Sequence, residues 1–265
     1  MAKILDGKAI SENILQEFKE QNRGMPTLAI LSVGDDPASE VYVRNKIRAC
    51  TEVGIATIAV HLPANVNPEI ARGIVREWAK SDTVSGIIVQ LPCEIDGIAE
   101  GIPLSKDVDG FRPGTSFTPC TPMGILWLLL KTGVSLTGKH AVVVGRSEIV
   151  GKPMARLLID HNCTVTQCHS KTVNLAAHTK QADILIVAVG RPHLITADMV
   201  KPGAIVIDVG INRVNDKLVG DVDFESVKEV AGWIAPVPGG VGPMTVAALI
   251  SNVLAAEEMK PHAHA

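Results

Sequence analysis

The chain has 265 residues, 46% hydrophobic and 20% charged, with 25 basic against 28 acidic side chains. This composition excludes a disordered or collagen-like chain, and the formal net charge of -3 excludes the strongly basic surface of a general nucleic-acid binder. The five cysteines contain no CxxC pair, so neither a disulfide framework nor a zinc cluster is expected, and the cytoplasm is the predicted location. Early charges and short apolar runs predict no signal peptide and no membrane segment.

The first part of the chain alternates helix and strand patterns. Helices are predicted over 10–21, 37–53 and 68–80, and strands over 27–34, 55–62 and 84–92. The segment 93–123 is rich in proline and glycine, which indicates a loop-rich crossover. A domain boundary is therefore predicted there.

A second alternation begins near residue 140. Strands are predicted over 140–145, 163–168, 182–189 and 204–209, and helices over 153–161, 173–180 and 246–259. Such alternation favours a parallel sheet with right-handed crossovers, and short Val/Ile runs suit strands that are buried on both faces. The expected fold is α/β with two domains, 1–118 plus 246–265 and 119–245, because the last helix can pack back on the first domain.

A glycine turn follows the strand at 140–145. Gly145 ends this strand, Arg146 and Ser147 follow it, and Gly151 opens the next helix. A helix N-terminus binds anions through its free backbone N–H groups and its dipole, so the pyrophosphate of a dinucleotide is expected here and the domain is predicted to be of the Rossmann type. The spacing departs from GxGxxG, and a plain glycine turn is the alternative.

The end of the strand at 163–168 bears on the choice of cofactor. The residues 168–172 include no Asp or Glu where an NAD-binding protein holds the ribose 2′-hydroxyl. A carboxylate would repel a 2′-phosphate, whereas Arg146, Ser170 and Lys171 can receive one, although Lys171 is equally well explained as a solvated surface charge. NADP is therefore predicted over NAD.

Tyr42 and Lys46 share one face of the helix predicted over 37–53. Such a pair can close over a flat ring and bring an amine to it, and Gln90 at the end of a buried strand can orient that amine without adding charge. A lysine serves as an acid or base near neutral pH only if its surroundings lower its pKa. The alternative is an ordinary helix surface.

Six motifs carry a resemblance that spans about residues 3–258. They are found at 42–46, 89–92, 106–111, 119–122, 144–153 and 236–245. In these motifs and in their order, the chain resembles the bifunctional methylenetetrahydrofolate dehydrogenase/methenyltetrahydrofolate cyclohydrolases. The resemblance implies NADP-dependent oxidation of 5,10-methylenetetrahydrofolate and hydrolysis of the methenyl product to 10-formyltetrahydrofolate. It also implies an N-terminal catalytic domain, an NADP-binding Rossmann-type domain, a cleft between them and a homodimer.

The same resemblance implies roles for individual residues. Lys46 would be the general acid/base, Gln90 its hydrogen-bonding partner and Asp109 the carboxylate that holds the pterin ring. Tyr42 would stack on the folate, and further substrate contacts would come from Val89, Leu91, Pro238, Gly239, Gly240, Val241, Gly242, Pro243, Met244 and Thr245. NADP would contact Gly145, Arg146, Ser147, Ser170 and Ile211. No metal, nucleic-acid or membrane partner is implied.

The chain departs from the family pattern after Gln90. Cys93 and Glu94 stand where Leu-Pro is usual, and the stretches 93–106 and 112–118 look shorter than is common. These differences put loop geometry and substrate affinity in doubt. Three alternatives stay open: a monofunctional dehydrogenase of the same family, a shikimate-type dehydrogenase, and a non-catalytic protein that senses NADP.

Overall fold

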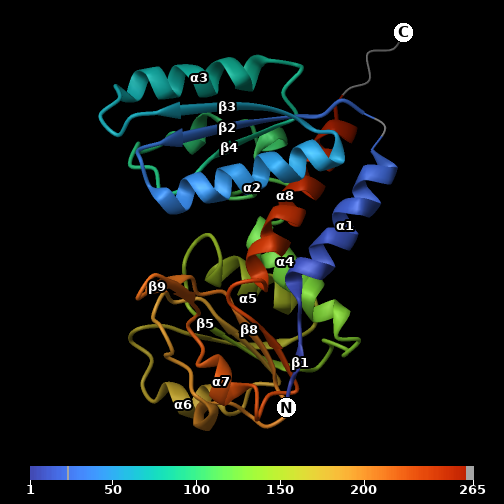
Figure 1. The fold of residues 1–265 in the computed structure, drawn as a ribbon, viewed down its shortest axis with the longest axis vertical. Coiled ribbons are helices and arrows are strands. Elements are labelled where there is room, and N and C mark those ends of the chain that lie inside the picture. The colour runs from blue at the N-terminus through green and yellow to red at the C-terminus, as the bar shows by residue number, and fades with distance from the viewer. Residues whose placement is uncertain (23, 261–265) are drawn as a thin grey trace. The chain divides into compact units, whose positions relative to one another are not determined.

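The computed structural model describes residues 1–22 and 24–260, which form two compact units (Figure 1). One unit contains Glu12–Cys120 and the chain from Val246 onward, and the other contains Met1–Ser11 and Thr121–Thr245. Both are built from parallel strands and helices, so the expected α/β class is confirmed. Within the described residues, no helix combines the length and apolar character that a membrane span requires.

The first eleven residues lie elsewhere than in the predicted division, which grouped 1–118 together. In the structure, residues 1–11 belong to the unit of Thr121–Thr245. The reason is strand β1 (Lys3–Ile4), which pairs in parallel with β11 (Trp233–Ala235).

The unit of Glu12–Cys120 is built on a three-stranded parallel sheet. Its strands are β2 (Thr27–Val33), β3 (Ala56–Leu62) and β4 (Gly86–Val89), in the order β3-β2-β4. Helices α2 (Pro37–Val53) and α3 (Pro68–Lys80) cover its opposite faces (Figure 1). Ala29 and Leu31 of β2 belong to a core cluster with Val75 and Trp78 of α3, whereas Leu28 and Ile30 are buried on the other face. The central strand is therefore apolar on both sides.

Local signals at both ends fix α2, the helix that carries Tyr42 and Lys46. The Asp36 carboxylate accepts a hydrogen bond of 2.8 Å from the backbone N–H of Ser39, and Pro37 occupies the first turn. Gly54 ends the helix in the left-handed region. The observed bounds equal the predicted 37–53.

The segment between β4 and residue 120 is mostly irregular, as predicted. It contains two short 3₁₀ helices, Ala99–Gly101 and Leu104–Lys106, and Asp107 forms an isolated parallel bridge with Ile87 of β4. The closing helix α8 (Val241–Glu258) begins five residues earlier than expected. Its Asn252 side chain donates hydrogen bonds to the Val108 and Thr118 carbonyls at 2.8 and 3.0 Å, so the second half of α8 packs on this unit as predicted.

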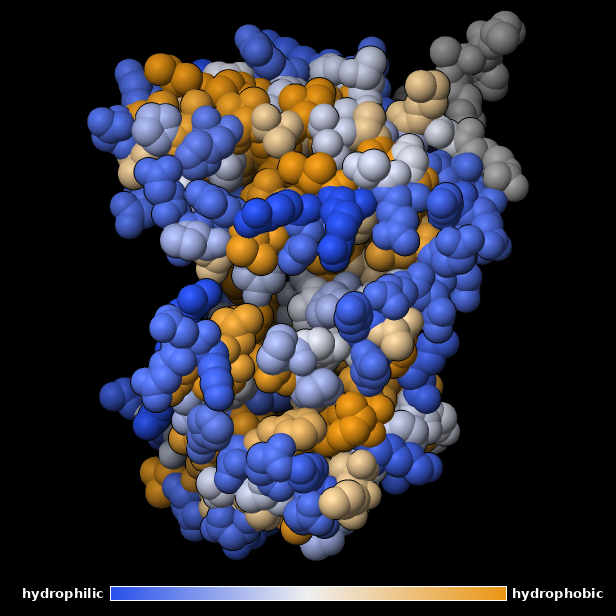
Figure 2. All heavy atoms as spheres, in the orientation of Figure 1, coloured by the Kyte–Doolittle hydropathy of each residue, from blue (hydrophilic) through white to orange (hydrophobic). Residues whose placement is uncertain are grey.

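The other unit is built on a six-stranded parallel sheet in the order β1-β11-β8-β7-β5-β6. Besides β1 and β11, it contains β5 (His140–Val144), β6 (Thr164–Cys168), β7 (Ile184–Val187) and β8 (Ile205–Asp208). The connecting helices are α5 (Gly151–Asp160), α6 (Leu175–Thr179) and α7 (Phe224–Val227). The strands β7 and β8 are buried along their whole length, while Figure 2 shows hydrophilic residues over much of the molecular face in view, with hydrophobic ones among them.

Several elements were not predicted, or begin at a residue other than the one expected. Helix α4 (Cys120–Lys131) begins inside the stretch expected to be a loop, and α1 (Gly7–Gln21) begins three residues before its predicted start. A two-stranded antiparallel hairpin, β9 (Asn212–Val214) and β10 (Lys217–Val219), follows β8.

Candidate functional site

Lys46 and Gln90 meet inside the unit of Glu12–Cys120. Lys46 lies on α2, Gln90 directly follows β4, and both side chains are buried. The Lys46 Nζ donates to Gln90 Oε1 at 3.1 Å, while Gln90 Nε2 donates to the Leu91 carbonyl at 2.8 Å. Because the amide nitrogen is engaged by that carbonyl, the amide oxygen is the atom that faces the lysine. Gln90 thus orients the amine without adding a charge.

Asp109 supplies a buried carboxyl to the same unit. Burial raises the pKa of Asp109, and although the Lys46 ammonium opposes this shift, the net direction is upward. Asp107 differs, because its Oδ2 accepts a hydrogen bond of 2.8 Å from the backbone N–H of Arg112. Of the two carboxyls, Asp107 is therefore held by the backbone of its own loop.

A cavity of about 300 Å³ lies beside Asp109 and Asp107. Val89 and Leu91, both predicted as substrate contacts, line it together with Cys93 and Phe111. The cavity therefore joins a carboxyl to apolar side chains, as recognition of a flat ring with polar edges requires.

The side chains one turn from Lys46 complete its surroundings. Tyr42 is half-buried on the same face of α2, and burial raises the pKa of its phenol. Cys50 is buried one turn further on, and burial raises the pKa of its thiol to about 12. Both groups are consequently neutral at pH 7.

The predicted cofactor residues lie along one edge of the six-stranded sheet. In the strand register Val144 pairs with both Cys168 and Val187, and Val187 pairs with Asp208, so the carboxyl ends of β5, β6, β7 and β8 lie in line. In open α/β sheets, ligands bind outside these ends. Residues 145–147, 170 and 211 follow three of these strands, so the structure brings them to one edge.

The turn at Gly145 is closely packed. Gly145 has φ +126°, and a Cβ at this position would overlap the Ala188 carbonyl oxygen, so only glycine fits. Arg146 and Ser147 are exposed, and Ser147 Oγ accepts hydrogen bonds from the backbone N–H groups of Val150 and Gly151 at 3.2 and 3.3 Å. The turn thus leaves the Arg146 side chain open to solvent at the start of α5.

A second turn stands beside the first, after β6. The backbone N–H of His169 donates to Thr172 Oγ1 at 2.8 Å, and the side chains of Ser170 and Lys171 are exposed at the centre of this turn. With an exposed Arg146 on the neighbouring strand end and no acid between residues 168 and 172, this edge fits a dinucleotide that carries a 2′-phosphate.

The predicted substrate loop at 238–245 belongs to the unit of the six-stranded sheet. Pro238 is exposed, and Gly239, Gly242, Pro243 and Thr245 are partly exposed. Gly240, Val241 and Met244 are buried, the last two at 5% and 0% exposure. Val241 and Met244 therefore present their side chains to the core of the protein.

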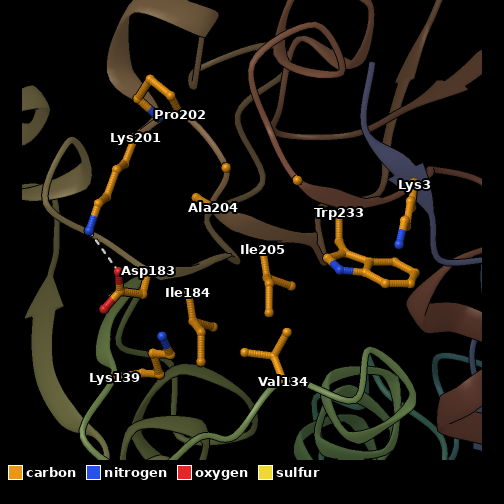
Figure 3. Close-up of a pocket in the computed structure, with 12 residues that line it drawn as sticks. Lys3, Val134, Lys139, Asp183, Ile184, Lys201, Pro202, Ala204, Ile205 and Trp233 are labelled. Atoms are coloured by element: carbon orange, nitrogen blue, oxygen red, sulfur yellow. Dashed lines mark hydrogen bonds and ion pairs between the residues drawn. The ribbon is translucent and has the colours of Figure 1, made fainter.

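A different cavity, shown in Figure 3, lies at the opposite edge of this sheet. Ile184, Ile205 and Trp233 line it and are the first residues of β7, β8 and β11. Lys201 and Asp183 form an ion pair of 2.7 Å at its side. None of the predicted site residues lines this cavity, so it is not part of the candidate site. In the described part of the chain, no group of three or more His, Cys, Asp or Glu side chains is placed to hold a metal ion.

Comparison with known proteins agrees with this arrangement. Residues 5–109 match the model of the tetrahydrofolate dehydrogenase/cyclohydrolase catalytic domain, and residues 119–261 match that of the corresponding NAD(P)-binding domain. The bifunctional protein FolD of Nitrosospira multiformis is 51% identical, over 97% of this chain and 96% of the relative.

Two solved structures are similar over nearly the whole chain. The bifunctional FolD enzyme of Campylobacter jejuni has a TM-score of 0.93 and 45% identity, with 97% of this chain and 99% of that one covered. The Trypanosoma brucei methylenetetrahydrofolate dehydrogenase-cyclohydrolase, solved with NADP and an inhibitor, has a TM-score of 0.93 and 35% identity, with 97% of each chain covered. The chain therefore belongs to the tetrahydrofolate dehydrogenase/cyclohydrolase family.

Proposed function

We propose that this protein oxidises 5,10-methylenetetrahydrofolate with NADP and then hydrolyses the 5,10-methenyltetrahydrofolate to 10-formyltetrahydrofolate. The observation that carries the proposal is the buried Lys46–Gln90 hydrogen bond, in the unit that also holds Asp109 and its cavity. The glycine turn and exposed Arg146 at the edge of the other sheet support the NADP part.

Asp109 is the proposed anchor of the pterin. The pterin ring presents an amino-pyrimidinone edge with adjacent N–H donors, and a carboxylate can accept both. Asp107 is less suited because the Arg112 backbone already donates to one of its oxygens. Val89 and Leu91 would contact the ring from the same cavity, and Tyr42 would stack on the folate.

The dehydrogenase step depends on the alignment of the folate with the cofactor more than on proton transfer. NADP, when bound, supplies the acceptor for a hydride from the carbon between N5 and N10. The methenyl cation left behind is stabilised by its two nitrogens. Holding the folate with Asp109 and the cofactor phosphates with Arg146, Ser147 and Ser170 is therefore the main contribution of the chain.

The cyclohydrolase step needs a proton carrier. Water adds to the methenyl carbon, and the oxygen of the adduct gives up both of its protons as it becomes the formyl oxygen. The bond from this carbon to N5 breaks as N5 takes up one proton, and the other proton is released to solvent. The Lys46 amine can accept the first proton, and its ammonium can return one to N5. Gln90 holds the Nζ by its hydrogen bond during both transfers.

The test of the proposed function is a spectrophotometric assay with 5,10-methylenetetrahydrofolate and either NADP or NAD. We expect NADPH to form, methenyl absorbance to decay faster than in buffer, and kcat/KM to be higher with NADP than with NAD. If NADPH forms but methenyl absorbance decays only at the uncatalysed rate, the protein is a monofunctional dehydrogenase. Binding of NADP without turnover would point to a sensor, and equal kcat/KM for the two cofactors would contradict the role of Arg146 and Ser170.

A pH dependence follows from the raised pKa of Asp109. We expect the KM for methenyltetrahydrofolate to rise several-fold as the pH falls from 8 towards 5, because a carboxyl with a raised pKa is protonated at higher pH than usual and loses acceptor capacity. Steady-state cyclohydrolase assays across this range provide the measurement.

Protonation of Asp109 is expected to weaken folate binding but to stabilise the folded, ligand-free protein. The folded protein binds this proton more readily than the unfolded chain, so protonation of Asp109 raises the free energy of unfolding of the ligand-free protein as the pH falls. Asp109→Asn, which cannot ionise, should show a high KM without this pH dependence. A wild-type KM that stays constant from pH 8 to 5 would contradict the assignment.

We also propose that the protein is a cytoplasmic homodimer. The dimer is supported by membership of the family, and the location by five cysteines whose thiols are all free. Light scattering after size-exclusion chromatography should give twice the chain mass of 28.1 kDa.

A further inference from the structure

Two buried carboxylates lie at the cofactor edge of the six-stranded sheet and have no part in the roles described above. Asp208 ends β8 and is 3% exposed, and Asp221 follows β10 and is 0% exposed. Within the described chain, neither forms an ion pair with a lysine, arginine or histidine. A buried carboxylate without a cation needs hydrogen-bond donors from its surroundings.

Asp221 finds four such donors. Oδ2 accepts from the backbone N–H groups of Val189 at 2.7 Å and Gly190 at 2.9 Å, and Oδ1 accepts from that of Arg191 at 2.7 Å. The fourth donor is Asn212 Nδ2, 2.9 Å from Oδ1. One side chain therefore ties the loop that follows β7 to the first residue of β9.

Asp208 holds Asp221 in place through the backbone. Its Oδ1 accepts from the N–H groups of Asp221 and Gly210, both at 3.0 Å, and its Oδ2 accepts from that of Val222 at 2.9 Å. A Cβ at Gly210 would overlap the Asp221 carboxyl, and a Cβ at Gly220 would overlap that of Asp208. Both carboxylates are thus packed directly against backbone.

The tied loops adjoin the proposed NADP contacts. Val189 follows Ala188, whose carbonyl oxygen packs against Gly145, and Ile211 lies between Gly210 and Asn212. The donors to Asp221 are therefore next in the chain to residues that contact the cofactor turn or carry a proposed cofactor contact.

We infer that Asp221 is a positioning residue for NADP, fixing the loops 189–191 and 210–212 through these four hydrogen bonds. The inference rests on the NADP-binding role proposed above. Asp221 is completely buried, so it acts through the loops and not by touching the cofactor. A loop that is already rigid loses less conformational entropy when a ligand binds. Making the two loops more mobile should therefore weaken NADP binding.

The decisive variant is Asp221→Asn. The amide has the same shape, but it offers one acceptor oxygen and turns an NH₂ group towards backbone N–H groups. We expect the KM and Kd for NADP to rise about tenfold, the dehydrogenase kcat to stay within about threefold, and methenyl hydrolysis without NADP to be unchanged. Amide hydrogen exchange at 189–191 should accelerate about tenfold in the protein without cofactor.

The direction of the effect separates positioning from simple electrostatics. Removing a negative charge near an anionic cofactor would strengthen its binding by Coulomb interaction alone. The matched control is Asp216→Asn in the turn of the same hairpin, where the side chain is 98% exposed and φ is +61°. This control should leave the Kd for NADP and the exchange at 189–191 within about twofold of wild type, because an exposed charge is screened by solvent.

Asn212→Ala keeps the inference testable if Asp221→Asn does not fold. It removes one of the four hydrogen bonds and should raise the Kd for NADP by about threefold, with faster exchange at 210–212. Wild-type Kd and exchange in a folded variant would overturn the inference, as would a loss of both activities in proportion to a loss of Tm. A wild-type protein that neither binds nor uses NADP would instead contradict the proposed function.

Discussion

Replacing Lys46 with alanine should lower the cyclohydrolase kcat by about a thousandfold, the size of effect that a positioned general acid/base supplies. The adduct must lose one proton and place another on N5, and the Lys46 amine, hydrogen-bonded to Gln90, is the group that we propose for this transfer. Hydride transfer leaves a cation that is already stabilised and needs little proton movement. We therefore expect the dehydrogenase kcat to fall by less than about tenfold. Methenyl decay and NADPH formation, followed in one assay, measure both activities.

The controls for Lys46 separate proton transfer from folding and from charge. Lys80→Ala removes a lysine from the exposed end of α3 in the same unit and should retain both activities. Lys46→Met keeps the length of the side chain without the amine, so it should reproduce the loss of hydrolysis with a smaller change in Tm. Hydrolysis near the wild-type rate in a folded Lys46→Ala protein would mean that another group carries the proton.

The parts of the fold that could be predicted have local causes. Helix α2 was predicted from its first to its last residue because Asp36, Pro37 and Gly54 mark its ends within the sequence itself. Helix α4 was missed because it is apolar all round, with Ile125 and Leu128 fully buried, and so lacks the amphipathic pattern of a helix that faces solvent. Strands β1 and β11 are two and three residues long, and only their pairing across the chain defines them.

The residues of the candidate site also divide into those that have a local sequence signal and those that have none. Lys46 and Gln90 were predicted because each is set by its own element, one on the face of a helix and the other at the end of a strand. Asp109 was recognised through a family motif, since both Asp107 and Asp109 line the cavity and only the hydrogen bond from Arg112 to Asp107 separates the two carboxyls. Asp208 and Asp221 were missed because their hydrogen bonds join segments up to 32 residues apart, and no sequence pattern marks a carboxylate whose partners are backbone N–H groups.

Replacing Gly145 with alanine should lower the dehydrogenase kcat/KM for NADP by about a hundredfold and leave methenyl hydrolysis close to wild type. The new Cβ would overlap the Ala188 carbonyl oxygen, which is backbone and cannot rotate away. The turn must therefore shift, and Arg146 and Ser147 shift with it. Hydrolysis is spared because Lys46, Gln90 and Asp109 all belong to the other unit. Steady-state kinetics with varied NADP, beside hydrolysis without it, measure the difference.

Gly133→Ala distinguishes the steric clash from the cost of the backbone conformation. Gly133 lies in the same unit as Gly145 and also has a positive φ, +72°, but nothing lies within 4 Å of the position of its Cβ. Alanine there should cost about 1 kcal/mol of stability and leave the KM for NADP unchanged. If both variants raised this KM equally, destabilisation of the unit would explain the effect. If only Gly145→Ala did so, the close approach of the turn to Ala188 would be what shapes the NADP site.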